Sequence, residues 1–470
     1  MEDESFGFIE DEILEIVRRY ERMRNDNQNL YFDVSEFETI IDYYLELNDV
    51  NYAYDAAESA AEQHPEASSI KLRRARVSID RGRAVDALKT IKAVENIEPS
   101  NYEVHLIKGS ALGMMGDIKG AARCFDKALA VDPTEEITIL LAITGILNNL
   151  NHYSLLTRYI KRLLEIEPNF VGHIYDLAFA YEKLGDYNQA IKHYLEYLDE
   201  EPFSDNAWYN LGVLYSKKGM DNKALNAYEY SLAINPENFF AIFNVANILS
   251  KEGNYSEALD YYLRYLEFED ESSEAMTYAA ECYESLGEDK KAMDMYREAI
   301  DLDPGFSQPW YGIGLLLLDR DPAESIRYLR KAVELKDDET EYWYYLSEAY
   351  SSCDRLKDSL RSLIKALNID PYYDSAWLRI GELILRDNYS SHAPCLLEKA
   401  VRIIGDVHGI RYLLASVYLK EGNDRLFKQH LRKALNESPE NFLFFSSLFP
   451  VKLMDRKTLN TIKKYNKKIK

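Results

Sequence analysis

Three pairs of neighbouring residues with binding chemistry recur at intervals of 34 residues: Tyr175 with Asp176, Tyr209 with Asn210, and Phe243 with Asn244. In each pair an aromatic ring is followed by an amide or a carboxylate. A side-chain amide can donate to and accept from a peptide backbone at the same time, and a ring can bury an apolar side chain beside it. One helical turn further along stand Phe179, Val213 and Asn247. Such a set is suited to holding an extended peptide largely independently of its sequence.

Catalytic and metal-binding constellations are missing from the sequence. It contains no Gly-x-x-x-x-Gly-Lys-Ser/Thr loop, no His-Glu-x-x-His pair and no Gly-x-Ser-x-Gly elbow. The 8 histidines are dispersed, and even His173 and His193, which share one 34-residue unit, lack a cysteine or carboxylate at ligand spacing. Gly312 and Gly314 form a Gly-x-Gly that follows no predicted strand. We therefore expect no enzymatic activity, no metal and no cofactor.

The 34-residue interval comes from a pattern of large, small and helix-stopping residues. Its clearest copy consists of Trp208, Leu211, Gly212, Tyr215, Gly219, Ala224, Tyr228, Ser231 and Pro236. The spacing i, i+3, i+4, i+7 predicts one amphipathic helix before Gly219 and a second helix after it. Gly219 suits the left-handed turn between the two helices, and Pro236 ends the unit. Gly212 and Ala224 are expected where the two helices approach most closely.

The same register extends along most of the chain. Proline ends the units at Pro65, Pro99, Pro133, Pro168, Pro202, Pro236, Pro304, Pro371 and Pro439, with Asp270, Asp337 and Gly405 in equivalent places. From this register we count twelve repeats, which span 34–67, 68–101, 102–135, 136–170, 171–204, 205–238, 239–272, 273–306, 307–339, 340–373, 374–407 and 408–441. Sustained strand-type alternation is absent, so the pattern predicts an all-α fold.

In these residues the chain resembles the tetratricopeptide-repeat family, over roughly residues 34–441. The resemblance implies an α-α superhelix, a solenoid of antiparallel helix pairs. We expect an N-terminal helical cap over 1–33 and a C-terminal capping helix with a basic tail over 442–470. The motif residues are packing residues, so the likeness is specific for the fold and says little about the ligand.

Two units depart from the pattern. The unit 136–170 has one extra residue and carries Ile143 and Leu150 where a small residue and the turn glycine are expected. The unit 307–339 is one residue shorter, and Pro322 is expected to open its second helix.

Charge narrows the class of partner. The chain has 80 acidic and 56 basic residues, a net charge of −24, and such a body repels nucleic acid, whose binding needs basic side chains on the phosphates. The exception is the C-terminal tail, with Lys452, Arg456, Lys457, Lys463, Lys464, Lys467, Lys468 and Lys470 beside the single acid Asp455. This tail is either a docking arm for an anionic partner or a capping helix that complements the acidic body.

No export or membrane signal is recognisable. The N-terminus is acidic, and no apolar stretch is long enough to span a bilayer. The cysteines Cys124, Cys282, Cys353 and Cys395 show no Cys-x-x-Cys spacing, which is typical of proteins in a reducing compartment. We therefore expect a cytoplasmic protein that does not insert into membranes.

The resemblance also assigns a place to the aromatic and amide pairs. In tetratricopeptide repeats the first helix of each pair lines the concave face, which implies that the three pairs, Phe179, Val213 and Asn247 face a groove. Further along the aromatic recurs as Tyr311, Tyr344 with Tyr345, and Tyr412. In the alternative interpretation the rings pack between neighbouring repeats and the amides only add solubility.

The chemistry of the expected groove favours a neutral or basic peptide. The carboxylate clamp of some tetratricopeptide cochaperones is missing around Asn244, because Tyr209, Val213, Glu274 and Tyr278 occupy the required places. The next stretch is acidic through Glu274, Glu281, Glu284, Glu341 and Glu348.

Two functions are compatible with the sequence. The first is a non-enzymatic scaffold or adaptor that binds an extended protein segment in its groove. The second is a structural, self-assembling solenoid, in which an edge or a terminal face mediates oligomerisation and the groove is empty. The sequence leaves the oligomeric state and the partner open.

Overall fold

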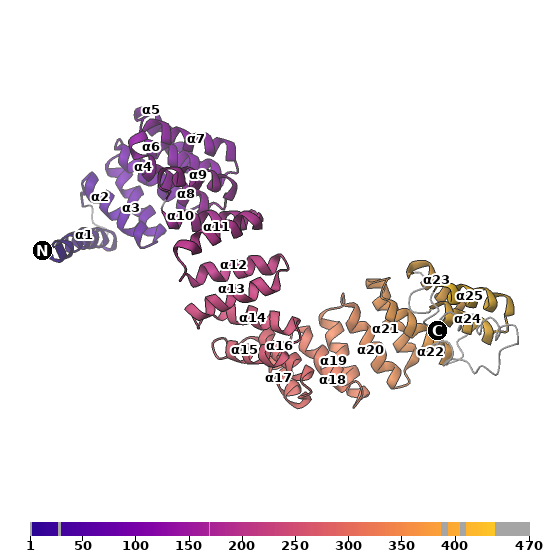
Figure 1. Ribbon diagram of the computed structural model, residues 1–470. Coiled ribbons are helices and arrows are strands. Elements are labelled where there is room, and N and C mark those ends of the chain that lie inside the picture. Colours follow the sequence, from indigo (N-terminus) through magenta and orange to yellow (C-terminus); the bar gives the residue numbers. More distant parts are fainter. Residues whose placement is uncertain (1, 27–29, 169, 387–392, 405–409, 438–470) are drawn as a thin grey trace. The chain divides into compact units, whose positions relative to one another are not determined.

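The computed structural model describes residues 2–26, 30–168, 170–386, 393–404 and 410–437 (Figure 1). In these residues every regular element is a helix, namely α1 to α25 and the short 3-10 helix η1 (Pro133–Glu135). The predicted all-α fold is confirmed. Gly405, Pro439 and the basic tail with its predicted capping helix lie outside the described residues.

The chain divides into two compact units, Met1–Glu237 and Asn238–Lys470. The first unit contains α1 (Glu2–Asn25), α2 (Val34–Glu46), α3 (Val50–Gln63), α4 (Ser68–Asp80), α5 (Ala84–Ile97), α6 (Tyr102–Met114), α7 (Ile118–Val131), α8 (Glu136–Asn149), α9 (Tyr153–Ile166), α10 (Val171–Lys183), α11 (Tyr187–Glu200), α12 (Asp205–Lys217) and α13 (Asp221–Ile234). The sequence register does not reveal this division, because Pro236 occupies its usual place directly before it.

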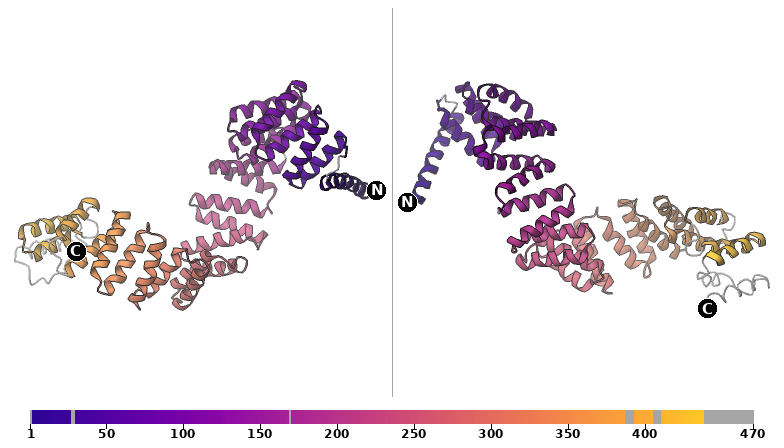
Figure 2. Two further views of the ribbon diagram at one scale, coloured as in Figure 1. Left: turned by 180° about the vertical axis from the view of Figure 1, so that it is seen from behind. Right: turned by 45° about the horizontal axis from the view of Figure 1, so that its top comes forward.

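The second unit has the same kind of helices. They are α14 (Phe239–Lys251), α15 (Tyr255–Leu266), α16 (Ser273–Ser285), α17 (Asp289–Leu302), α18 (Ser307–Leu317), α19 (Pro322–Leu335), α20 (Thr340–Ser352), α21 (Leu356–Ile369), α22 (Asp374–Arg386), α23 (Ala393–Ile404), α24 (Ile410–Lys420) and α25 (Asp424–Glu437). Within each unit the helices are stacked one after another (Figure 2).

Each even-numbered helix from α2 to α24 packs against the odd-numbered helix that follows it. These are the predicted first and second helices. First helices of neighbouring pairs also touch, as α4 with α6 in the first unit and α16 with α18 in the second. We call the surface that the first helices present to solvent the first-helix face. The number of repeats stays a prediction.

Glycine and proline end the helices where the sequence predicts. Gly219, after α12, has a φ of +68°, and six more glycines in the described residues have positive φ. This left-handed conformation lets the chain turn without a Cβ clash. Second helices that precede a proline stop two residues before it, as α13 stops at Ile234 before Pro236. Proline has no N–H for the next helical hydrogen bond and disfavours helical geometry in the residue before it.

The predicted close approach between paired helices is also confirmed. Ala224 is fully buried, and a Cβ added to Gly212 would lie 2.6 Å from ring carbons of Tyr228. Gly109 meets Phe125 in the same way, at 2.4 Å. The small residue on the first helix therefore makes room for a large side chain on the second helix.

Each of the 4 tryptophans forms the same type of hydrogen bond, which the sequence pattern does not predict. Each indole N–H donates to the backbone carbonyl six residues earlier, at the place where the previous unit ends. The bonds run from Trp208 to Pro202 at 2.9 Å, Trp310 to Pro304 at 3.2 Å, Trp343 to Asp337 at 2.9 Å and Trp377 to Pro371 at 3.0 Å. A carbonyl that the helix end leaves unpaired thus gains a partner.

The two irregular units show how the chain absorbs a change of length. Helix α8 has 14 residues, whereas α6 and α10 have 13, so the extra residue lengthens the first helix. As a consequence the left-handed residue is Asn151, with φ +56°, and the expectation that Leu150 stands at the turn is wrong by one residue. Asparagine tolerates this conformation better than other non-glycine residues. In the shorter unit, Pro322 opens α19 as predicted, and the Asp321 side chain accepts from the backbone N–H of Glu324.

Candidate functional site

Six of the nine predicted groove residues lie in the first unit, on two neighbouring first helices. Helix α10 carries Tyr175, Asp176 and Phe179, and α12 carries Tyr209, Asn210 and Val213. None of the six is buried: Asp176 is exposed, and the others are half-buried. These six side chains are therefore accessible to a ligand, and the half-buried ones also pack against neighbouring residues.

Asn210 connects the two helices through its amide. Its Nδ2 donates to the hydroxyl of Tyr175 at 2.9 Å and to the hydroxyl of Tyr194 on α11 at 3.3 Å. The Asn210 side-chain oxygen has no hydrogen bond to any described residue. A fixed amide with a free acceptor can receive an N–H from a peptide backbone.

The rings beside this amide are held by other rings. Tyr175 lies edge-on to Tyr194, with ring centroids 5.4 Å apart, and 5.1 Å from Tyr197. Burial raises the pKa of the Tyr175 hydroxyl, so it stays protonated at neutral pH. Desolvation likewise raises the pKa of the Asp176 carboxyl, and the charge of His173 opposes this rise. Packing of the rings against neighbouring helices, the alternative interpretation, is therefore part of what the structure shows.

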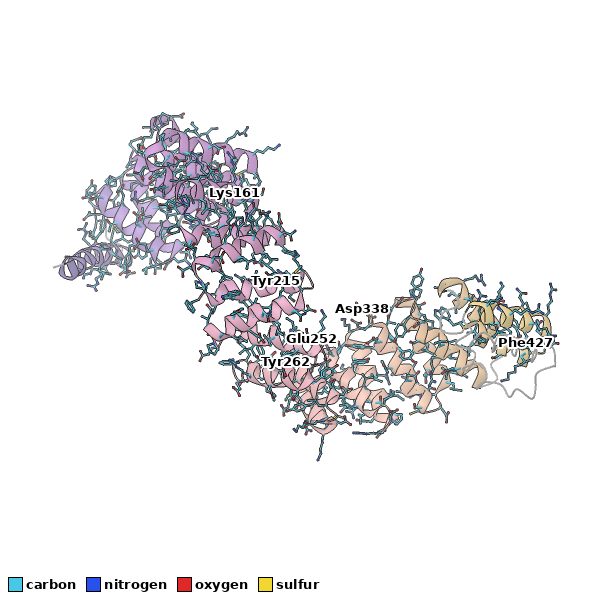
Figure 3. All side chains as sticks on the ribbon, in the orientation of Figure 1. Lys161, Tyr215, Glu252, Tyr262, Asp338 and Phe427 are labelled. Atoms are coloured by element: carbon cyan, nitrogen blue, oxygen red, sulfur yellow. The ribbon has the colours of Figure 1, made fainter. Side chains whose placement is uncertain are left out.

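The other three predicted residues lie in the second unit, on α14. Asn244 is half-buried, and its Nδ2 donates to the Phe240 carbonyl of its own helix at 2.9 Å. Asn247 accepts a short hydrogen bond of 2.6 Å from the hydroxyl of Tyr262, which is labelled in Figure 3. Phe243 lies 5.0 Å from Tyr265, measured between ring centroids. Asn244 is thus the less restrained of the two amides.

Aromatic residues continue along the first helices of the second unit. Tyr311, Tyr344 and Tyr345 are half-buried, as a position on the first-helix face requires. Tyr412 on α24 is fully buried, so the expectation that it faces a groove is wrong. At Tyr412 the 34-residue register alone does not tell a packing position from a surface position.

The acidic residues among these rings form contacts that sequence reasoning missed. Glu281 on α16 accepts from Gln308 Nε2 on α18 at 2.7 Å, and Glu284 accepts from the Tyr296 hydroxyl at 3.1 Å. The composition of the helices could have indicated that these carboxylates lack basic partners on the same face, because α16, α18 and α20 contain no lysine or arginine.

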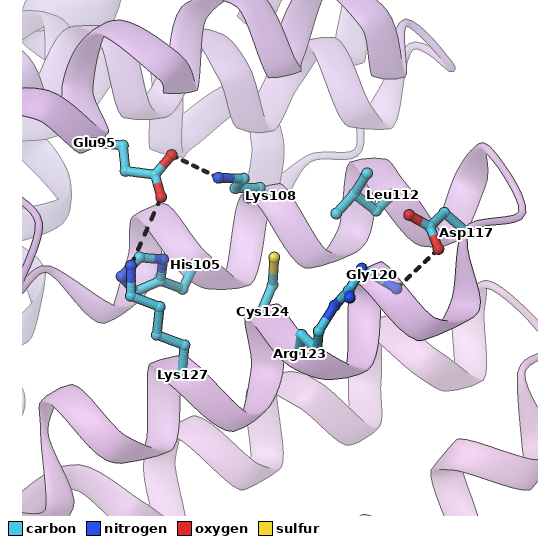
Figure 4. Close-up of a pocket in the computed structure, with 9 residues that line it drawn as sticks. All are labelled: Glu95, His105, Lys108, Leu112, Asp117, Gly120, Arg123, Cys124 and Lys127. Atoms are coloured by element: carbon cyan, nitrogen blue, oxygen red, sulfur yellow. Dashed lines mark hydrogen bonds and ion pairs between the residues drawn. The ribbon is translucent and has the colours of Figure 1, made fainter.

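A cavity of about 290 Å³ in the first unit contains titratable groups (Figure 4). Glu95 accepts from Lys108 Nζ at 2.6 Å and lies 3.8 Å from Lys127 Nζ. Burial raises the pKa of the Cys124 thiol and lowers the pKa of His105. A nucleophilic cysteine needs a lowered pKa, so the geometry shows a satisfied ion pair beside a protonated thiol and no activated nucleophile.

The described residues contain no group of three or more His, Cys, Asp or Glu side chains that could hold a metal ion. Within the same residues no helix has the length and the apolar character needed to cross a membrane. The four cysteines, all inside the described ranges, are free thiols.

Three protein-family models that match the chain describe tetratricopeptide repeats or a TPR-like domain. Residues 174–303 match the middle TPR-like domain of cilia and flagella-associated protein 70, residues 44–208 match the tetratricopeptide repeat of protein kinase G, and residues 408–441 match a tetratricopeptide repeat. No curated protein matches the chain.

Several solved structures are similar in fold. YrrB, described as a TPR protein with an unusual peptide-binding site, is 18% identical, with 39% of this chain and 95% of YrrB covered and a TM-score of 0.33. MamA is 24% identical, with 35% and 98% covered and a TM-score of 0.33. Yeast Tom70 is 13% identical, with 92% and 95% covered and a TM-score of 0.40.

The family models match successive stretches of both units, and each matched stretch consists of paired helices with the small, turn and stop residues described above. The chain belongs to the tetratricopeptide-repeat family.

Proposed function

We propose that this protein is a non-enzymatic scaffold or adaptor that binds an extended protein segment on its first-helix face. The observation that carries the proposal is Asn210, whose amide is fixed by two tyrosine hydroxyls while its oxygen accepts no hydrogen bond from any residue that the structure describes. A pre-positioned acceptor loses little freedom when a peptide N–H reaches it.

The surroundings of Asn210 support the same function. Half-buried rings beside the amide, such as Tyr175 and Tyr209, offer apolar area for side chains of a bound segment. The aromatic and amide pair is repeated on α14 by Phe243 and Asn244. Each such site can hold a segment mainly through its backbone, which suits a scaffold that accepts different sequences.

Catalysis is not part of this proposal. The fold is typically a non-catalytic one, and its function is defined by the surface it offers to partners. We propose a cytoplasmic protein whose partners are proteins with neutral or basic segments, and neither nucleic acids nor cofactors.

The test is capture of partners by the full chain, comparing Asn210→Ala with Asn244→Ala against the wild type. We expect the double variant to lose most partner recovery, because each change removes a backbone-binding amide. The matched control is Asn222→Ala with Asn226→Ala, two exposed asparagines on the second helix α13. It should recover partners like the wild type.

A further variant separates binding from structure. Tyr175→Phe removes one internal partner of the Asn210 amide and leaves the amide in place. Partner capture should survive this change, with a loss of stability of about 1 kcal/mol. Unchanged capture by the double asparagine variant would refute the proposal. If the wild type is an oligomer by light scattering and the double variant keeps both that oligomeric state and its partners, the self-assembling solenoid is favoured instead.

A further inference from the structure

In the second unit, three successive first helices combine tyrosine rings with carboxylates that no lysine or arginine among the described residues neutralises. Helix α16 presents Glu274, Tyr278 and Glu281 at i, i+4 and i+7, which is one stripe of the helix. Helix α18 adds Tyr311, and α20 adds Glu341 and Tyr345. We call these six residues the acidic aromatic face.

Contacts between the helices show that these residues lie together along neighbouring first helices. Glu281 on α16 accepts from Gln308 on α18. The Tyr311 ring lies edge-on to Tyr345 on α20, with centroids 5.9 Å apart, and Tyr278 lies 6.1 Å from Phe243 on α14. The face therefore continues from the aromatic and amide pair on α14.

Two of the three carboxylates of this face accept hydrogen bonds from neutral donors. Glu274 accepts from the Tyr278 hydroxyl at 3.1 Å, and Glu281 accepts from the Gln308 amide. Among the described residues no lysine or arginine forms an ion pair with Glu274, Glu281 or Glu341. The contrast is Glu348 on the same helix as Glu341, which pairs with Arg379 at 2.7 Å.

The local electric field agrees with this absence of cations. After burial, the next cause that raises the pKa of Tyr278, to about 12, is the negative charge of Glu274. The negative charge of Glu341 likewise raises the pKa of the hydroxyls of Tyr311 and Tyr373, as the next cause after burial. Glu281 is half-buried, so its carboxylate loses hydration without gaining a partner charge, whereas Glu274 and Glu341 are exposed and accessible to a ligand.

Resting on the proposed scaffold function, we infer that the acidic aromatic face is the docking surface for an arginine-bearing segment of another protein. The guanidinium is planar, so it can stack on a tyrosine ring and donate two parallel hydrogen bonds to one carboxylate. Arginine is also weakly hydrated, so it enters a half-buried site more readily than lysine. The charges are complementary, since the face carries three carboxylates and no basic residue.

The test uses the full chain and fluorescein-labelled peptides of alternating arginine and serine, with lysine–serine and glutamate–serine peptides for comparison. Fluorescence anisotropy should show binding of the arginine peptide, weaker binding of the lysine peptide and none of the glutamate peptide. Affinity should fall as salt rises from about 0.05 M to about 0.3 M, because ion pairs are screened.

The variant Glu281→Gln with Glu341→Gln should weaken binding of the arginine peptide by at least about tenfold, since both ion pairs are lost. The control, Glu257→Gln with Glu298→Gln, removes two exposed charges from the second helices α15 and α17. It changes the net charge equally and should alter the affinity less than about twofold. Equal weakening by both pairs would mean attraction by net charge alone and would overturn the inference.

One further arm tests the chain's own basic tail as the occupant. If Lys463, Lys464, Lys467 and Lys468 are all changed to glutamine, the inference expects an unchanged affinity for the arginine peptide. A large gain in affinity would show that the tail covers the face, and would overturn the assignment to another protein. If basic peptides do not bind while the Asn210 and Asn244 variants still lose partners, this inference fails and the proposed function stands.

Discussion

Individual glycines in this protein have different roles, although all of them look alike in the sequence. Gly212 on α12 faces the Tyr228 ring so closely that an added Cβ would lie 2.6 Å from it. Gly145 on α8 has no atom within 4 Å of the same position. The first glycine is required by packing, and the second only loosens its helix.

The two glycines give opposite predictions. Gly212→Ala should lower the free energy of unfolding by about 1–3 kcal/mol, because the new methyl forces Tyr228 or the helix to move. Gly145→Ala should raise it by about 0.5–1 kcal/mol through helix propensity. Urea unfolding followed by circular dichroism measures both changes. Destabilisation by both variants would show that packing at Gly212 is not special.

Residue-scale predictions from the sequence succeed where the cause is local. Gly219 and Pro236 end helices through their own backbone, so the 34-residue spacing identifies their role directly. The partners of Asn210 are different, since Tyr194 and Tyr175 lie 16 and 35 residues away in the chain. Which hydroxyl meets the amide depends on the packing of three helices, and the register does not contain that information.

At the scale of one helix, α16 holds two carboxylates in half-buried positions, which is unfavourable for folding. Its carboxylates Glu281 and Glu284 are half-buried, and burial raises the pKa of both. Hydrogen bonds from Gln308 to Glu281 and from the Tyr296 hydroxyl to Glu284 partly oppose this rise in pKa. A carboxyl whose folded pKa is raised binds its proton more tightly in the folded state than in the unfolded state.

This linkage predicts a stabilising variant. At a pH above the folded-state pKa of Glu281 and Glu284, both side chains are ionised in the folded protein, and their charges oppose folding. The folded protein therefore loses stability as the pH rises through these raised pKa values, and it is still less stable at neutral pH. Glu281→Gln with Glu284→Gln should therefore raise the Tm at pH 7 by about 1–3 °C, and the gain should shrink as the pH falls through the raised folded pKa and vanish below the usual glutamate pKa of about 4.3. Thermal unfolding at several pH values measures the difference. A lower Tm at pH 7 would show that the carboxylates hold α16 in place.

Helix α8 marks the limit of prediction at this scale. The extra residue in 136–170 is visible in the sequence, but its location is decided by packing. Lengthening α8 keeps Ile143 and Leu147 buried and moves the turn to Asn151. A longer loop would have been an equally valid reading of the same spacing.

For the whole molecule, tyrosine is the dominant aromatic residue, with 37 copies against 18 phenylalanines. Burial raises the pKa of many of these hydroxyls, for Tyr278, Tyr344 and Tyr373 to about 12. A raised folded pKa means that the neutral hydroxyl stabilises the fold fully below the unfolded value of about 10, and that this stability is lost as the pH rises further.

The molecule should therefore unfold in alkali in a step coupled to tyrosine ionisation. Tyrosinate absorbance and helical circular dichroism, recorded on the same samples, should change together above about pH 10. The net charge of −24 adds self-repulsion in the same direction, so added salt should move the step to higher pH. Complete ionisation with an intact helical signal would show that the hydroxyls are not buried in solution.

Because each tryptophan forms the same hydrogen bond to the preceding unit, tryptophan fluorescence can report on local structure at four places in the chain. Trp208 is the only indole in the first unit, whereas Trp310, Trp343 and Trp377 lie in the second unit. Each indole N–H is hydrogen-bonded to a backbone carbonyl at the end of the preceding helix pair. Its fluorescence emission therefore reports whether that helix pair and the next one are packed together. With the other three replaced by phenylalanine, Trp208 becomes a fluorescent readout placed one residue before Tyr209 and two before Asn210, where a bound segment is expected to lie.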